Sequence, residues 1–261
     1  PRPREPHRNE QGRCDRDLGP KFRSPTRRSI RDAVMGLTEA LQIPAIAVSD
    51  RALREGVVYD LLGRLSDQDV RHETVIGMAR RFGVDQAHAD SVRTASIGLL
   101  QATSAGWPEL SGSFACRQML SWAAQLHEIG LYVAHSSYHK HGEYLIRNAD
   151  LHGFSQTDQR LLAVLVRLHR GKFQQAVLDE VPEIWRDRLA RLGVLLRMAV
   201  ILRRGRSRDA LPAIGVKVRG QQLTMEFPAD WLEGHALTRA GLERECDWLK
   251  GAGFRLRVKA A

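Results

Sequence analysis

The residues most capable of chemistry lie between Leu126 and Leu145. This stretch contains two acids, one lysine and four of the ten histidines of the chain. The four histidines are His127, His135, His139 and His141. Imidazoles and carboxylates can bind a divalent metal or transfer protons, whereas cationic side chains can bind an anion. Three interpretations are therefore open: a metal site, a phosphate site or a solvated polar surface.

A dispersed set of metal ligands is the first candidate. His88 precedes the adjacent pair His127-Glu128, and Asp150 follows it. Imidazoles and carboxylates from separate helices could surround a divalent ion and activate a bound water. The pattern resembles the HD phosphohydrolase superfamily, whose motif is a histidine, a His-Asp pair and a final aspartate. Because the pair here is His-Glu, the alternative is a degenerate HD fold whose histidines serve structure or contact an anion.

A cationic cluster is the second candidate. Its members are His135, His139, Lys140, His141 and Arg147. Further charge would join them if neighbouring helices pack alongside, from Arg93, Arg167, His169, Arg170 and Lys172. Such groups bind phosphates through charge-assisted hydrogen bonds. A solvated face remains the competing interpretation, above all for residues 167–172, but solvated faces are usually mixtures of Lys and Glu.

Helices are predicted wherever apolar residues recur at three- and four-residue spacing. The predicted ranges are 68–82, 85–103, 113–129, 142–148, 156–170 and 182–203. The last range is apolar nearly all round, which predicts a central, buried helix. Alternating residues then predict a hairpin and, after a further helix, a third strand. These ranges are 213–218, 223–227, 235–250 and 254–258.

The predicted fold class is mainly α. An HD-like all-helical domain at residues 64–204 is followed by a small α+β unit of β-β-α-β order at residues 205–261. Residues 30–63 read as helix, strand and helix, too short for a domain of their own. They look like the last edge of a larger α/β domain.

Composition and charge narrow the class of protein. The 261 residues carry a net charge of +10, and no run of about 18 apolar residues predicts a membrane span. Half of that charge lies in residues 1–29, with nine Lys/Arg against four Asp/Glu and five of the ten prolines. This composition predicts a disordered leader, read either as a nucleic-acid-binding arm or as a cloning, gene-model or truncation remnant. Three distant cysteines favour a reducing cytoplasm.

Several separated motifs resemble the exopolyphosphatases and guanosine pentaphosphate phosphohydrolases. The motifs are Ser49-Asp-Arg-Ala-Leu-Arg-Glu-Gly-Val-Val-Tyr-Asp, His127-Glu-Ile-Gly, residues 135–139, residues 141–146 with Asn148 and Asp150, and Leu192-Gly-Val-Leu-Leu. They are collinear over about residues 30–261. The sequence departs from the family at residues 1–29, and at Arg51, where a glycine is usual.

The resemblance implies a larger homodimeric enzyme in which two actin-like domains bind the terminal phosphate and magnesium. Their phosphate loops and catalytic carboxylate would lie upstream of Ile30, so residues 30–63 would be the remnant edge of an actin-like domain. Arg54 and Glu55 would belong to the interdomain boundary. The helical domain would guide the polyphosphate chain through His127 and the five residues of the cationic cluster.

The sequence therefore predicts the C-terminal part of an exopolyphosphatase. The whole enzyme would release terminal orthophosphate from polyphosphate, with guanosine pentaphosphate as a possible further substrate. This chain is expected to bind polyphosphate, to hydrolyse it negligibly and to hold no cofactor of its own. The alternatives are an HD-type metallophosphohydrolase acting on nucleotides through His88, His127, Glu128 and Asp150, and a nucleic-acid-binding regulator that uses the leader.

Overall fold

The computed structural model describes residues 35–36, 70–207 and 209–260. The predicted leader, the predicted actin-like edge apart from residues 35–36, and the residues Arg54 and Glu55 fall outside these ranges. The chain divides into two units, 1–49 and 50–261, and every helix and strand discussed below belongs to the second unit.

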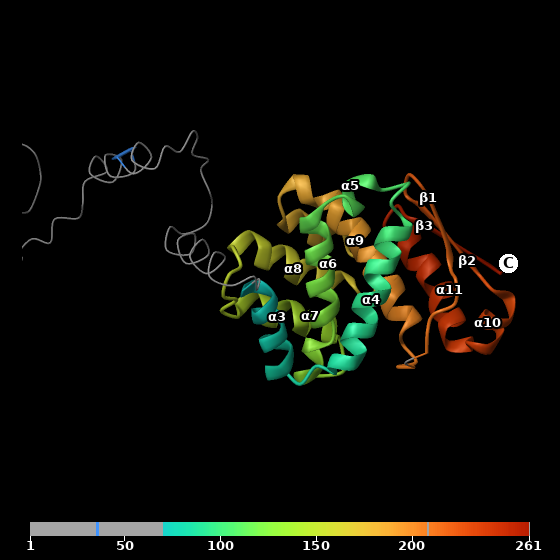
Figure 1. Cartoon of the computed structure of the whole chain (residues 1–261), viewed down its shortest axis with the longest axis horizontal. Helices are drawn as coiled ribbons and strands as arrows, with labels where there is room; N and C mark the ends of the chain where they lie inside the picture. Colours follow the sequence, from blue (N-terminus) through green and yellow to red (C-terminus); the bar gives the residue numbers. More distant parts are fainter. Residues whose placement is uncertain (1–34, 37–69, 208, 261) are drawn as a thin grey trace, which may run out of the picture. The chain divides into compact units, whose positions relative to one another are not determined.

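The described chain forms a layer of helices followed by a small sheet with its own helices (Figure 1). The helical part consists of α3 (Val70–Arg81), α4 (Gln86–Ala102), α5 (Pro108–Ser111), α6 (Phe114–Leu126), η1 (Ile129–Tyr132), α7 (Tyr138–Asn148), α8 (Gln156–Leu168), η2 (Gln175–Glu180) and α9 (Glu183–Leu202). The remaining elements are β1 (Gly215–Arg219), β2 (Gln222–Phe227), α10 (Ala229–Gly234), α11 (Ala236–Lys250) and β3 (Arg255–Ala260). The prediction of a mainly α fold with a small α+β unit is confirmed.

Three of the long helices begin at a polar residue whose side chain accepts a hydrogen bond from the backbone N–H three residues later. These residues are Asp85, Ser113 and Ser155. Each one satisfies a backbone donor that the first turn of a helix leaves unpaired. The caps fix where α4, α6 and α8 start, and hence where the histidines near their ends lie.

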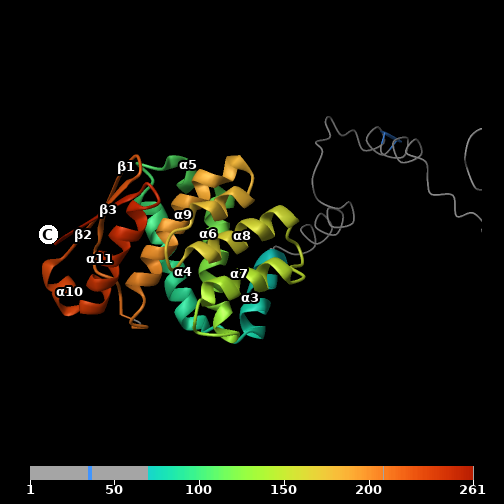
Figure 2. The same cartoon turned by 180° about the vertical axis from the view of Figure 1, so that it is seen from behind.

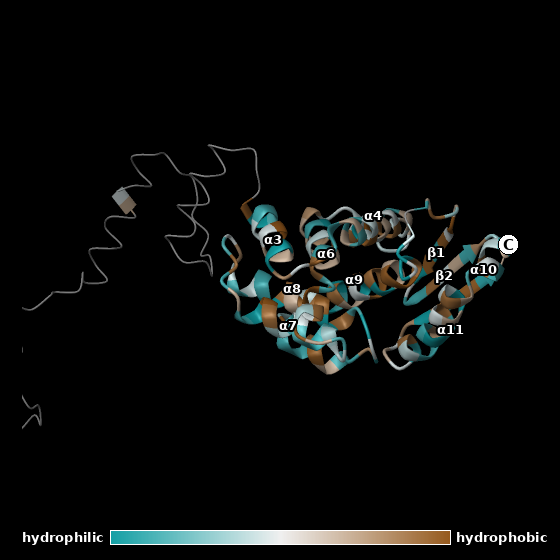
Figure 3. Cartoon of the chain, turned by 90° about the horizontal axis from the view of Figure 1, so that it is seen from below, coloured by the Kyte–Doolittle hydropathy of each residue, from teal (hydrophilic) through white to brown (hydrophobic). Residues whose placement is uncertain are grey.

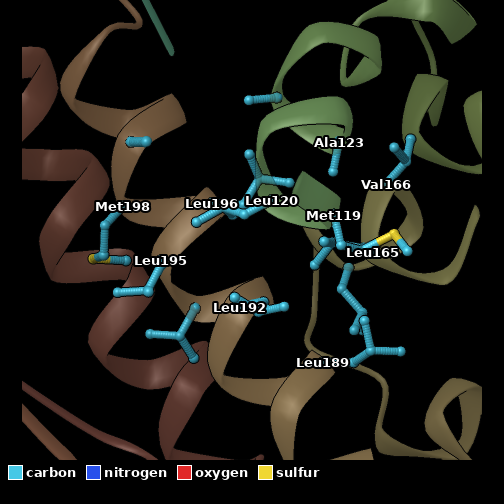
Figure 4. Close-up of a cluster of buried hydrophobic side chains, with 14 of the residues drawn as sticks. Met119, Leu120, Ala123, Leu165, Val166, Leu189, Leu192, Leu195, Leu196 and Met198 are labelled. Atoms are coloured by element: carbon cyan, nitrogen blue, oxygen red, sulfur yellow. The ribbon is translucent and has the colours of Figure 1, made fainter. Parts of the chain in front are cut away.

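The core is centred on α9, as its sequence predicted. This helix packs against α4, α6, α8 and α11, and it is largely brown, meaning hydrophobic, in Figure 3. Figure 4 shows its leucines meeting side chains of α6 and α8, among them Leu120 and Leu165. Most of the labelled side chains are fully buried. Each buried leucine contributes about 1.5–3 kcal/mol by leaving water.

The sheet has the order β1-β2-β3. Strands β1 and β2 form an antiparallel hairpin, and β3 returns parallel to β2 after α10 and α11. The indole N–H of Trp107 donates to the carbonyl oxygen of Gly220 in the hairpin turn, at 3.0 Å. This hydrogen bond ties the hairpin of the sheet to the segment between α4 and α5, 113 positions earlier in the sequence. Figure 2 shows the same arrangement of elements from behind.

Two predicted helix boundaries were wrong at the centre of the histidine-rich stretch. Helix α7 begins at Tyr138 rather than at residue 142, and α6 ends at Leu126 rather than at residue 129. Gly142 suggested a break between helices, but it lies inside α7 where η1 approaches closely. His139 and His141 therefore lie on a helix, whereas His127 lies in the turn after one.

Substitution Gly130→Ala is expected to lower the free energy of unfolding by about 2–3 kcal/mol. A Cβ at Gly130 would lie 1.9 Å from the carbonyl oxygen of Tyr138 and 2.5 Å from the backbone nitrogen of Gly142, so η1 and α7 would have to separate. Urea denaturation measures the change. The matched control is Gly98→Ala on the exposed face of α4. A Cβ there would meet no described atom within 4 Å other than those of its chain neighbours and its own helix backbone. This variant should be neutral or stabilise by up to about 1 kcal/mol. Equal effects of the two substitutions would contradict the close packing.

Candidate functional site

Four histidines from four different elements meet beside α9. His88 lies in the first turn of α4, His127 follows α6, His139 lies in α7 and His169 follows α8. The ring centroids of His88 and His127 are 5.5 Å apart, and those of His127 and His169 are 5.6 Å apart. His139 lies 6.3 Å from His169. The fold thus gathers residues that are separated by up to 81 positions in the sequence.

Backbone carbonyl groups set the orientation of two of these rings. The Nδ1–H of His127 donates to the carbonyl oxygen of Ala124 at 2.7 Å, and that of His169 donates to Val166 at 2.5 Å. In each neutral ring the Nε2 atom then carries a lone pair. Both Nε2 atoms are buried and have no hydrogen-bond partner among the described residues.

Burial keeps the rings neutral. It lowers the pKa of His127 to about 4 and the pKa of His169 well below the usual 6.5. The pKa of His139 is also lowered to about 4, first by burial and then by nearby cations such as Arg167 and Lys140. Burial lowers the pKa of His88 as well, although the carboxylate of Glu128 opposes this. At neutral pH the cluster therefore offers imidazole lone pairs rather than positive charges.

An acidic edge adjoins the histidines. One carboxylate oxygen of Glu128 lies 3.8 Å from Nε2 of His88. Ligand atoms of His88, His127 and Glu128 all lie within 4.8 Å of one another. Asp150, the fourth ligand suggested by the sequence pattern, is exposed and does not belong to this group of three. The structure therefore brings together three of the four residues in the pattern.

Arg206 covers this acidic edge. Its guanidinium donates to both carboxylate oxygens of Glu128, at 2.8 and 2.9 Å, and to Asp85 at 2.9 Å. The backbone of Arg206 has φ of 53°, in the left-handed region that residues with a side chain rarely adopt. Asp85 in turn caps α4, and its hydrogen bond from the His88 backbone, assisted by Arg206, lowers the pKa of its carboxyl group.

A pocket of about 220 Å³ opens beside the cluster. Polar residues on its lining are His88, Glu128, His135, His169, Arg170, Arg204, Arg206 and Glu245. Tyr138 and Trp248 contribute aromatic walls. The guanidinium of Arg170 lies 4.8 Å from the centre of the Tyr138 ring, so a cation is held at this rim. The pocket combines an acidic edge, neutral imidazoles and several arginines.

In the cationic cluster predicted from the sequence, some residues are exposed, whereas others are partly buried or form ion pairs. His135 and Lys140 are exposed, while His139 and His141 are partly buried on α7. Arg147 forms ion pairs with Glu143 at 2.9 Å and with Glu180 at 2.6 Å. His127 is fully buried, so its ring has no direct access to a polymer in this conformation. Whether these residues contact phosphate stays a prediction.

The additional cationic residues likewise fall into two groups, those that pair with acids or amides and those that do not. Arg167 donates to Glu143 and to Gln174, and Arg93 pairs with Asp90. Arg170 and Lys172, in contrast, are exposed and form no ion pair with an acid of the described residues. The charge available to an anion is therefore concentrated where the start of α7 meets the turn after α8.

Sequence reasoning missed several residues of this site. Asp85, Arg204 and Arg206 were not among the candidate site residues predicted from the sequence. A second omission is the pair Arg197 and Glu245, of which Glu245 lines the pocket. The run Arg203-Arg-Gly-Arg at the end of a buried helix was the available signal, but nothing in it indicated which acids it would meet.

Comparison with known proteins identifies the family. The model of the Ppx/GppA phosphatase family's domain III matches residues 70–246. The chain belongs to the Ppx/GppA phosphatase family. The family resemblance found in the sequence is thereby confirmed.

Curated relatives extend this match beyond domain III. The guanosine-5'-triphosphate,3'-diphosphate pyrophosphatase of Pseudoalteromonas translucida is 33% identical over 229 residues, which cover 86% of this chain and 45% of the relative. The protein of the same name from Aeromonas hydrophila is 30% identical over 228 residues, covering 87% and 46%. This member of the Ppx/GppA family therefore spans less than half the length of these relatives.

Among the helices that the structure describes, none has the length and apolar character required to cross a membrane.

Proposed function

We propose that this chain is the phosphate-chain-guiding part of a Ppx/GppA phosphatase. The whole enzyme would use a metal-positioned water to attack a terminal phosphorus atom and release orthophosphate. Inorganic polyphosphate is the proposed substrate, and guanosine pentaphosphate is a second one suggested by the names of the relatives. Both substrates present a linear chain of phosphoanhydrides to the protein.

One observation carries this proposal: Arg170 and Arg204, two cations without an acidic partner among the described residues, line the pocket. Lys140 at the start of α7, Arg170 and Lys172 after α8, and Arg204 after α9 form no ion pair within the described ranges. Arg170 and Arg204 line the pocket, as does His135. Free guanidinium and ammonium groups bind phosphate oxygens without first having to break an internal pair.

Hydrolysis of the terminal phosphoanhydride would take place in another part of the enzyme. Magnesium and the catalytic carboxylate would belong to the actin-like domains, of which residues 30–63 would be the edge. Residues 64–204 and residues 205–261 would together guide the polymer and form a homodimer. The chain alone should release negligible phosphate from polyphosphate in the presence of magnesium. Release well above that of heat-inactivated protein would contradict this division of labour.

The double substitution Lys140→Ala/Arg170→Ala is expected to weaken polyphosphate binding at least tenfold, which corresponds to about 1.4 kcal/mol. Both cations are free to contact phosphate, so their loss should also reduce the slope of log Kd against log salt concentration. Fluorescence anisotropy with labelled polyphosphate measures both quantities.

The matched control for this experiment is Arg255→Ala/Arg257→Ala on β3. It removes the same charge from two exposed positions outside the pocket lining. The control should lower affinity much less. Equal losses in the two double variants would show non-specific attraction to a basic surface and would contradict the proposed binding site.

The two alternative functions receive less support. An HD-type phosphohydrolase was predicted with Asp150 as a ligand, but Asp150 is not in the group formed by His88, His127 and Glu128. A nucleic-acid-binding regulator would depend on residues 1–29, which lie outside the described residues. Tight DNA binding that disappears when residues 1–29 are deleted would favour the regulator.

A further inference from the structure

We propose that His88, His127 and Glu128 form a binding site for a first-row transition-metal ion, and that the guanidinium of Arg206 holds this place when no ion is bound. The site differs from the set suggested by the sequence pattern, because it excludes Asp150. It is also separate from the magnesium proposed for the actin-like domains, and it does not depend on polyphosphate binding.

The distances favour two ligands of one ion over a direct contact between His88 and Glu128. Nε2 of His88 and Oε1 of Glu128 are 3.8 Å apart, which is too long for a hydrogen bond. Two ligands that each lie about 2.1 Å from one ion are separated by at most about 4.2 Å. The ligand atoms of all three residues lie within 4.8 Å of one another, so small side-chain movements would close the set.

His127 provides the second, independent observation. Its side chain is fully buried, and its Nδ1–H donates to the carbonyl oxygen of Ala124. Its Nε2 atom has no hydrogen-bond partner within the described part of the chain. An unpaired polar atom in a protein interior is costly. A carbonyl group that fixes Nδ1–H and leaves Nε2 free is the usual arrangement around a metal-bound histidine. The ring is thus oriented to offer its Nε2 lone pair to a ligand.

Arg206 indicates that the site attracts a cation. The side chain of Glu128 is only 12% exposed, and Arg206 meets both of its oxygens. Arg206 itself is 47% exposed and lies in the segment between α9 and β1, in a rarely adopted backbone conformation. It can therefore move away towards solvent, and a divalent ion would compete with it for Glu128.

Two imidazoles and one carboxylate define the class of ion. Imidazole nitrogen donors suit Zn²⁺, Ni²⁺, Cu²⁺ or Fe²⁺, and Co²⁺ serves as a spectroscopic probe of such a site, whereas Mg²⁺ and Ca²⁺ prefer oxygen ligands. Three protein ligands leave one or more coordination positions for water or another group. His169 lies beside His127 and lines the same pocket, but it is outside the proposed ligand set.

Cobalt binding tests the proposal on the whole chain, without an affinity tag and after treatment with a chelator. One equivalent of Co²⁺ should bind, produce visible d–d absorption bands, and be displaced by Zn²⁺. Glu128→Gln and His88→Gln should each weaken binding at least tenfold. Asp150→Asn should bind as the parent does, which separates this set from the one containing Asp150. Circular dichroism checks that each variant is folded.

Arg206→Gln is the decisive variant, because it removes the competing cation and keeps all three ligands. It should bind Co²⁺ at least tenfold more tightly than the parent chain. A purely structural role of Arg206 predicts no such gain. The proposal is overturned by absence of Co²⁺ binding, by loss of binding in Asp150→Asn with retention in Glu128→Gln, or by unchanged affinity in Arg206→Gln.

Discussion

Replacing Arg197 by Met is expected to lower the free energy of unfolding by about 3–5 kcal/mol. Arg197 lies on α9 with 1% of its side chain exposed, and it forms an ion pair with Glu245 on α11, which is 3% exposed. It also donates to the carbonyl oxygens of Leu168 and Gly171, each at 2.5 Å. The substitution would leave a buried carboxylate and two carbonyl groups without their donor.

Urea denaturation of three variants separates the ion pair from simple loss of packing. The double variant Arg197→Met/Glu245→Gln should recover a substantial part of the lost stability, because no unpaired charge remains in the interior. The control is Arg188→Met on the same helix, where Arg188 contacts the Trp185 ring and is only partly buried. It should cost less than about 1 kcal/mol. Similar losses for Arg188→Met and Arg197→Met would refute the role of the buried pair.

Acidification is expected to destabilise the metal-free chain between about pH 6.5 and pH 4. The pKa of His127 is about 4 in the folded protein against 6.5 for an ordinary histidine. In this window the unfolded chain binds a proton that the folded chain excludes, so stability falls as the pH falls. Over the whole window His127 contributes about 3 kcal/mol. His169, whose pKa burial also lowers well below the usual 6.5, acts in the same direction.

The test compares the pH dependence of unfolding in parent and variant proteins. With a chelator present, the free energy of unfolding is measured at several pH values within that window. His127→Gln removes one titrating group and should flatten the curve, whereas His72→Gln, at an exposed position on α3, should leave its slope unchanged. A parent chain whose stability does not depend on pH here would show that the buried histidines are protonated without cost.

The sequence by itself determined the class of fold and the family. Helices α4, α8 and α9 were predicted because their apolar periodicity is a local property, readable without knowing what the helix packs against. The buried character of α9 followed from apolar residues around nearly its whole circumference. The family followed from collinear motifs, which depend on order along the chain and not on contacts.

Only the tertiary structure decided which histidines and arginines are buried or already paired, and which remain free to contact a ligand. His127 and His135 are alike in sequence, yet burial makes the first a neutral ring with a fixed lone pair while the second stays exposed. Arg147 and Arg170 have the same charge, but Glu143 and Glu180 engage only the first. Arg206 meets Glu128 across 78 positions of sequence. Burial and pairing depend on such distant neighbours, and a local pattern does not contain them.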